Sequence, residues 1–227
     1  MIKKAKKYIL LIMIACFAMI SLTACSSESR NKYMAYKDDI VVATVNGTNI
    51  YLSEVLYKKF LNNEYVDGLY TLDAENKYEL SNTERELYKY KTDEEILEEI
   101  ITDEALFQYA VSLGYEKMSE KEVSAKYTSV DEIDLDSITD RVLGELQVDV
   151  IKKTYEVLNM TEDQFVTYMA PIGVRGSLAG VYENDIRTHY KAEHEQASND
   201  EINAAVNSKT DEILKNTLIE KFDFSEE

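Results

Sequence analysis

The side chains best suited to bind a metal ion in this sequence belong to its two histidines, His189 and His194. On a helix, Glu193 would share a face with His189, but the five-residue spacing of the histidines places them on different faces. Protein zinc sites take three or four ligands, and no further ligand stands at a suitable spacing. We therefore interpret both histidines as solvent-exposed, and we expect neither a metal nor a cofactor.

A second candidate for metal binding is an acidic stretch. Asp134, Asp136 and Glu145 match three liganding positions of an EF-hand calcium loop. However, Ile138 stands at another liganding position, and Thr139 stands where the turn of the loop requires glycine. We interpret Asp136 or Ser137 as a helix cap and expect no calcium site.

The carboxylate runs could in principle supply a pair of groups for acid–base catalysis. Asp93-Glu94-Glu95 and Glu98-Glu99 fall at the start and on the polar face of an expected helix, where solvation keeps them ionised. The sequence contains neither a Gly-x-Ser-x-Gly elbow nor a glycine-rich phosphate loop. We therefore expect no catalytic residues, and we predict that the protein is not an enzyme.

The first 25 residues show how one side chain would be modified. Four lysines precede an apolar run from Tyr8 to Ile20, which is typical of an export signal and is too short for a membrane span. The next residues, Leu22-Thr23-Ala24-Cys25, resemble the lipobox of bacterial lipoproteins. This resemblance implies that residues 1–24 are a signal peptide and that Cys25 becomes acylated, with chains such as palmitate. The protein would then be lipid-anchored at the extracytoplasmic face of a bacterial cell membrane.

Charge narrows the range of partners. The 227-residue chain has a formal net charge of −18, which becomes −22 when the four lysines of the signal are removed. Such a charge repels nucleic acid, so we expect no nucleic-acid partner. Two interpretations stay open, namely solubility outside the cell and attraction of basic polypeptides that emerge from the export machinery. Residues 25–37 are polar and are predicted to form a flexible tether before a domain at 38–227.

The expected elements are mostly helices. Pro171 is the only proline, which argues against a turn-rich β fold. Capping boxes, in which a hydroxyl side chain is followed three residues later by Glu or Gln, mark helix starts. They occur at Ser81/Glu84, Thr92/Glu95, Ser119/Glu122, Thr161/Gln164 and Ser198/Glu201. Gly114 is expected to end the helix that begins after Thr92. The stretch from Pro171 to Ser177 is predicted to be a loop or a broken helix.

A β-hairpin is expected near the start of the domain. Residues 40–45 are apolar and β-branched, Asn46-Gly47 favours a two-residue turn, and residues 48–51 can form the return strand. Because an isolated hairpin is only marginally stable, it needs another strand beside it. The best candidate is the end of the chain, Lys221–Phe224, so we predict that the N- and C-terminal segments meet in one small sheet.

Four segments, taken in order, resemble a known family. They are Val42–Ile50 with Ser53-Glu54-Val55, the stretch from Ile96 through Gly114 to Val123, Met160–Phe165, and Phe222-Asp223-Phe224. In this order they are similar to the SurA/PrsA-type chaperone domain of exported foldases. The resemblance implies a mostly α, SurA/trigger-factor-like helical domain with its hairpin paired to the C-terminal segment. It also implies a holdase that binds unfolded or newly exported polypeptides.

The same comparison shows what this chain lacks. Family members that isomerise prolyl bonds insert a parvulin domain before the closing helix, whereas here only the polar residues 192–200 stand there. We therefore predict that prolyl isomerase activity is absent. An alternative role on the same scaffold is a lipoprotein adaptor that holds one specific envelope partner.

Tyrosine is the side chain best suited to weak, adaptable client contact, because its ring is apolar and its edge tolerates water. The chain has 17 tyrosines and no tryptophan. The candidate client contacts are Tyr57, Tyr109, Tyr155, Tyr168 and Tyr182. Further tyrosines in the expected helical parts are Tyr65, Tyr70, Tyr78, Tyr88 and Tyr90.

Overall fold

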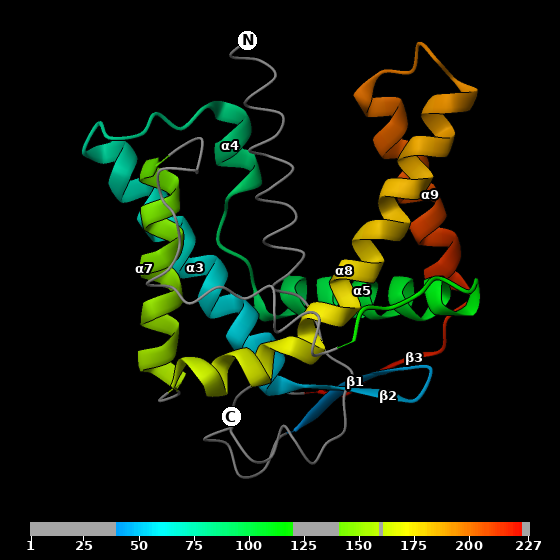
Figure 1. The fold of residues 1–227 in the computed structure, drawn as a ribbon, viewed down its shortest axis with the longest axis horizontal. Coiled ribbons are helices and arrows are strands. Elements are labelled where there is room, and N and C mark those ends of the chain that lie inside the picture. Colours follow the sequence, from blue (N-terminus) through cyan, green and yellow to red (C-terminus); the bar gives the residue numbers. More distant parts are fainter. Residues whose placement is uncertain (1–39, 120–140, 159–160, 224–227) are drawn as a thin grey trace.

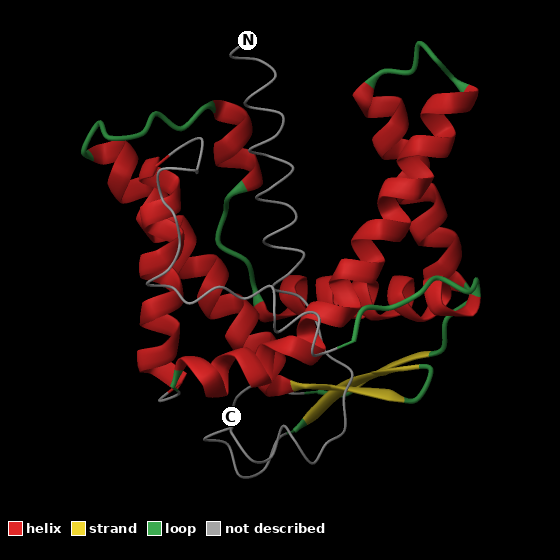
Figure 2. Cartoon of the chain, viewed as in Figure 1, coloured by secondary structure: helices red, strands yellow, loops and turns green. Residues whose placement is uncertain are grey.

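The structure, a computed structural model, describes residues 40–119, 141–158 and 161–223 (Figure 1). This part of the chain is mostly helical with one small antiparallel sheet, as the sequence predicts (Figure 2). Its elements are β1 (Val41–Val45), β2 (Thr48–Tyr51), α3 (Leu52–Ala74), α4 (Asn82–Leu87), α5 (Asp93–Ser112), α7 (Arg141–Leu158), α8 (Glu162–Glu193), α9 (Asn199–Lys215) and β3 (Ile219–Lys221).

The predicted hairpin is confirmed. β1 and β2 pair in antiparallel fashion, with Val45 opposite Thr48. The two residues between them, Asn46 and Gly47, have φ values of +47° and +81°. Positive φ at both central positions is the conformation that a type I′ turn requires, and Asn-Gly adopts it most readily.

The C-terminal segment completes the sheet on the other side of β1. The strand order is β2-β1-β3, with Ile219 opposite Val45. Just beyond β3, the backbone N–H of Phe222 donates to the carbonyl of Val42 at 2.9 Å. The predicted meeting of the two segments is therefore confirmed, although the strand is Ile219–Lys221, so that only Lys221 of the predicted segment belongs to it. Phe224 lies outside the described residues.

The sheet and α5 form a base for the molecule (Figure 1). The side chains of Val42, Val45 and Ile50 are 0% exposed. They belong to one apolar cluster with residues of α5, the middle of α8 and the end of α9, including Ile96 and Ile213. Burial of this face makes the hairpin stable, because the hydrophobic effect contributes about 25 cal/mol per Å² of apolar surface removed from water.

Two helical arms diverge from this base (Figure 1). In the α3–α7 arm, which includes α4, a second apolar cluster joins Tyr57 and Leu69 of α3 to Val150 of α7 and to the start of α8. The helices approach closely at Gly68, where a Cβ atom would lie 2.0 Å from Cδ1 of Leu146. In the α8–α9 arm, the second half of α8 packs against α9 as a helical hairpin.

Most of the helix boundaries follow the sequence signals. The capping boxes that start α4, α5, α8 and α9 form as predicted at Ser81, Thr92, Thr161 and Ser198. Gly114 follows the end of α5 with a φ of +88°, as expected of a left-handed stop. The box predicted at Ser119 reaches Glu122, which lies outside the described residues.

The prediction that Pro171–Ser177 form a loop or a broken helix is wrong. These residues lie inside α8, which continues without interruption from Glu162 to Glu193. Ile172 and Val174 are buried, one in each apolar cluster. Burial on both sides therefore outweighs the local cost of proline and glycine in a helix. Figure 1 shows α8 changing direction between the base and its arm, and proline and glycine are residues at which helices bend.

Candidate functional site

The tyrosines predicted as client contacts do not form one exposed surface. Tyr57 and Tyr182 are only 4% and 5% exposed, so they belong to the core in this conformation. Tyr109 is half-buried. Tyr155 and Tyr168 lie in α7 and α8, but their side chains are outside the described part of the structure.

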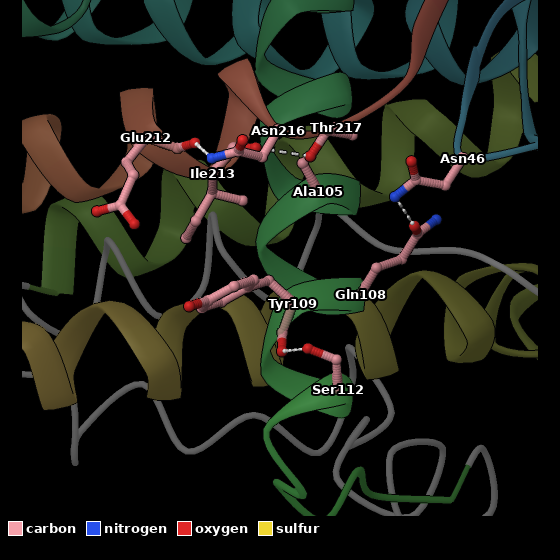
Figure 3. A pocket seen from close by; sticks show the side chains of 9 residues that line it. All are labelled: Asn46, Ala105, Gln108, Tyr109, Ser112, Glu212, Ile213, Asn216 and Thr217. Atoms are coloured by element: carbon pink, nitrogen blue, oxygen red, sulfur yellow. Dashed lines mark hydrogen bonds between the residues drawn. The ribbon is translucent and has the colours of Figure 1, made fainter.

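A hollow of about 240 Å³ lies beside Tyr109, between α5 and the end of α9 (Figure 3). Figure 3 labels its lining side chains, which include Asn46 from the hairpin turn and Asn216 and Thr217 from the end of α9. Several polar groups of this lining form hydrogen bonds within the walls. The Thr217 hydroxyl donates to the carbonyl of Ile213 at 2.8 Å, for example. The lining of the hollow is thus mixed, with apolar side chains such as Ala105 and Ile213 beside polar ones.

Tyr109, which lines this hollow, belongs to a group of three tyrosines. The Tyr182 ring makes edge contacts with Tyr109 and Tyr115, with centroids 5.6 and 5.7 Å apart. The Tyr115 hydroxyl donates to Asp185 at 2.7 Å, which raises the pKa of Tyr115. Burial raises the pKa of Tyr182. Both groups therefore remain neutral hydroxyls near neutral pH, which suits a structural role.

A group of three charged side chains is buried where α3, α5 and α8 cross. Arg175 of α8 donates from its two terminal nitrogens to Glu54 of α3 and Glu104 of α5, each at 2.8 Å. The three side chains are 1–3% exposed. Burial alone lowers the pKa of Arg175, but the charges of Glu54 and Glu104 outweigh it, and the net shift is upward. The guanidinium is therefore permanently charged.

Hydrogen bonds connect this ionic triad to the turn of the hairpin and to Leu218, just before β3. Glu104 accepts a hydrogen bond from Gln108 at 2.7 Å, and Gln108 accepts one from Asn46 at 2.8 Å. Asn46 in turn accepts the backbone N–H of Leu218 through its side chain at 2.9 Å and donates its own N–H to the Leu218 carbonyl at 2.8 Å. The helix crossing at the triad and the closure of the sheet thus belong to one polar network.

Sequence reasoning missed this triad. Arg175 stands among apolar and small residues, and Glu104 lies within the apolar stripe of α5. The triad could have been suspected from charged residues at positions that the helical spacing of apolar residues assigns to the core. A buried charge needs a partner, because leaving it unpaired costs too much free energy. This pattern identifies Arg175 and Glu104 as candidates but does not show that they meet, nor that Glu54 joins them.

Three large exposed side chains lie on the α3–α7 arm. Tyr70 of α3, Leu87 of α4 and Tyr90, just after α4, are 37%, 49% and 55% exposed. The Tyr90 hydroxyl donates to Asp67 of α3 at 2.5 Å, and the guanidinium carbon of Arg85 lies 5.7 Å from the centroid of the Tyr70 ring. We call Asp67, Tyr70, Leu87 and Tyr90 the arm patch. Tyr70 and Tyr90 were recognised in the sequence only as members of a larger tyrosine set.

The histidines are found near the outer end of α8. His189 and His194 contact backbone carbonyls four residues earlier, at 2.9 and 3.1 Å, and His194 stacks on Tyr190. Within residues 40–119, 141–158 and 161–223, no group of three His, Cys, Asp or Glu side chains is arranged to hold a metal ion. Glu145 pairs with Arg141, while Asp134 and Asp136 lie outside the described residues.

The signal segment and Cys25 also lie outside the described residues. Among the helices that are described, none is long and apolar enough to cross a membrane.

Comparison with known proteins adds no relative. No protein-family model matches the sequence, and no curated protein matches it either. Any statement of function therefore depends on the residues and their arrangement.

Proposed function

We propose that this protein is a membrane-anchored extracytoplasmic chaperone, a holdase for unfolded or newly exported polypeptides, without prolyl isomerase activity. The anchor is lipid on Cys25. In this proposal the protein does no covalent chemistry and uses no cofactor. The SurA/PrsA-type resemblance of the sequence belongs to the same proposal.

The observation that carries the proposal is the closure of the base by the two ends of the domain. Because β3 pairs with β1, the intervening chain must leave the base and return to it. It does so in two arms that diverge (Figure 1). The buried triad of Glu54, Glu104 and Arg175 ties the roots of these arms together. Such a frame offers surfaces on two sides of one client segment.

Exposed apolar side chains on an arm support the same function. A chaperone without ATP needs contact area that is weak and adaptable, since close complementarity would select a single partner. The arm patch offers two tyrosine rings and Leu87, each between about a third and just over half exposed. Helix α4 lies on the side of its arm nearer the α8–α9 arm (Figure 1).

The proposal is tested by measuring light scattering from three unrelated denatured proteins diluted into buffer with the purified protein. We expect suppression of aggregation in all three cases. The triple variant Tyr70→Ser/Leu87→Ser/Tyr90→Ser should bind these clients roughly tenfold or more weakly, if each side chain contributes about 0.5–1 kcal/mol. Leu113→Ser is the matched control, since Leu113 is 54% exposed but lies at the end of α5.

Two results would contradict the proposal. One is the absence of any suppression together with a single tight, stoichiometric partner, which would indicate the adaptor role. The other is acceleration of a proline-limited refolding reaction, which would indicate an isomerase.

A further inference from the structure

The arm patch combines apolar rings with negative charge. The Tyr90 ring stands beside the Asp67 carboxylate, which accepts the Tyr90 hydroxyl. In residues 64–90, which include α4 and the outer half of α3, acidic side chains outnumber basic ones. Glu79 and Glu86 of this stretch are also exposed. The surface that a client would touch is therefore negative as well as aromatic.

The same arm already binds one cation by a ring and a carboxylate together. The Arg85 guanidinium carbon lies 5.7 Å from the centroid of the Tyr70 ring, while its Nη2 atom lies 2.6 Å from Asp73. The hydrogen bonds from Leu80 and Arg85 lower the pKa of Asp73, so this carboxylate is ionised near neutral pH. An aromatic face next to a carboxylate attracts a guanidinium or ammonium group through both its quadrupole and its charge partner.

Tyr90 and Asp67 also bring a ring and a carboxylate together, here with the carboxylate at the hydroxyl edge of the ring. Within the described residues, no lysine or arginine forms an ion pair with Asp67. The charge of Asp67 contributes to the raised pKa of Lys153, but Lys153 pairs with Glu64, at 2.7 Å. The hydrogen bond to Asp67 raises the pKa of Tyr90, so the hydroxyl keeps its proton near neutral pH. Tyr90 is 55% exposed, which leaves its ring accessible.

We propose that the arm patch binds extended polypeptide segments in which a lysine or arginine stands beside apolar residues. The basic side chain lies against the Tyr90 ring and faces Asp67, and its apolar neighbours contact Leu87 and Tyr70. This inference rests on the proposed holdase function and names the class of client segment. The negative charge of the whole protein draws the same segments toward it, because opposite charges raise the rate of encounter.

The test uses three labelled peptides of equal length that alternate leucine with lysine, glutamine or glutamate. Binding to the full chain is followed by fluorescence anisotropy. We expect affinity to fall in the order lysine, glutamine, glutamate, and the preference for lysine to shrink as salt is raised.

Asp67→Asn should weaken binding of the lysine peptide about two- to fivefold. Asparagine still accepts the Tyr90 hydroxyl, so the local structure is retained. Tyr90→Leu, which keeps the apolar area, should have an effect of about the same size.

Asp211→Asn is the matched control, because it removes one exposed carboxylate from α9 on the other arm. It should leave the lysine preference unchanged. Equal affinity for the three peptides, or equal effects of Asp67→Asn and Asp211→Asn, would overturn the inference. If aggregation is still suppressed in that case, the holdase function stands without this specificity. If aggregation is not suppressed and no peptide binds, the proposed holdase function is contradicted, and the inference that rests on it falls with it.

Discussion

Replacing Arg175 with methionine is expected to lower the free energy of unfolding by about 3–5 kcal/mol, because the change leaves two carboxylates buried without their cation. Glu54 and Glu104 would face each other at side-chain exposures of 3% and 1%. Equilibrium denaturation in urea, followed by circular dichroism, measures the loss.

Two further variants make this result specific. Arg187→Met changes a half-buried arginine of the same helix and should cost no more than about 1 kcal/mol. The triple variant Arg175→Met/Glu54→Gln/Glu104→Gln removes all three charges and should recover much of the stability, because no unpaired charge remains buried. An Arg175→Met protein as stable as the Arg187→Met protein would show that the triad does not hold the roots of the arms together.

Removal of the chain from Leu218 onward is expected to cause the second largest loss of stability. It deletes β3 and with it the hydrogen bonds to Asn46 and Val42. Each such bond contributes about 0.5–1.5 kcal/mol, so the total loss is a few kcal/mol. Hydrogen-exchange mass spectrometry should show faster exchange in β1, which lies at the centre of the sheet.

A point variant separates the backbone contribution from that of the side chain. Phe222→Pro removes the N–H that donates to Val42, whereas Phe222→Ala keeps it and removes the same half-exposed ring. Proline should destabilise β1 more than alanine does. Unchanged exchange in β1 after the truncation would mean that the two ends of the domain do not depend on each other.

Much of this fold could be predicted because its signals are local. Asn46-Gly47 specifies a turn by its backbone preference alone, and Thr92 with Glu95 satisfies the free amides of its own helix. The pairing of β3 with β1 followed from a physical need, since a lone hairpin is marginal. Its register did not follow, because it is fixed by the bonds between Asn46 and Leu218, which are 172 residues apart.

The parts that could not be predicted depend on tertiary packing. Pro171 and its neighbouring glycines favour a break by local preference, but burial between two apolar clusters keeps them helical. Tyr57 and Tyr182 have the same chemistry as Tyr70 and Tyr90, and only the path of the chain decides which pair faces solvent. Arg175 illustrates both points, since its partners come from helices far away in sequence.

The central claim, that the arms hold unfolded polypeptide on their inner side, is tested most directly by site-specific photo-cross-linking. A benzophenone side chain is placed either at Leu87 of α4 or at Asp149, an exposed residue of α7. Figure 1 shows α7 on the side of its arm away from the α8–α9 arm. We predict that an unfolded client cross-links to the Leu87 position and much less to Asp149. Equal cross-linking at both positions, or none at Leu87, would contradict the claim.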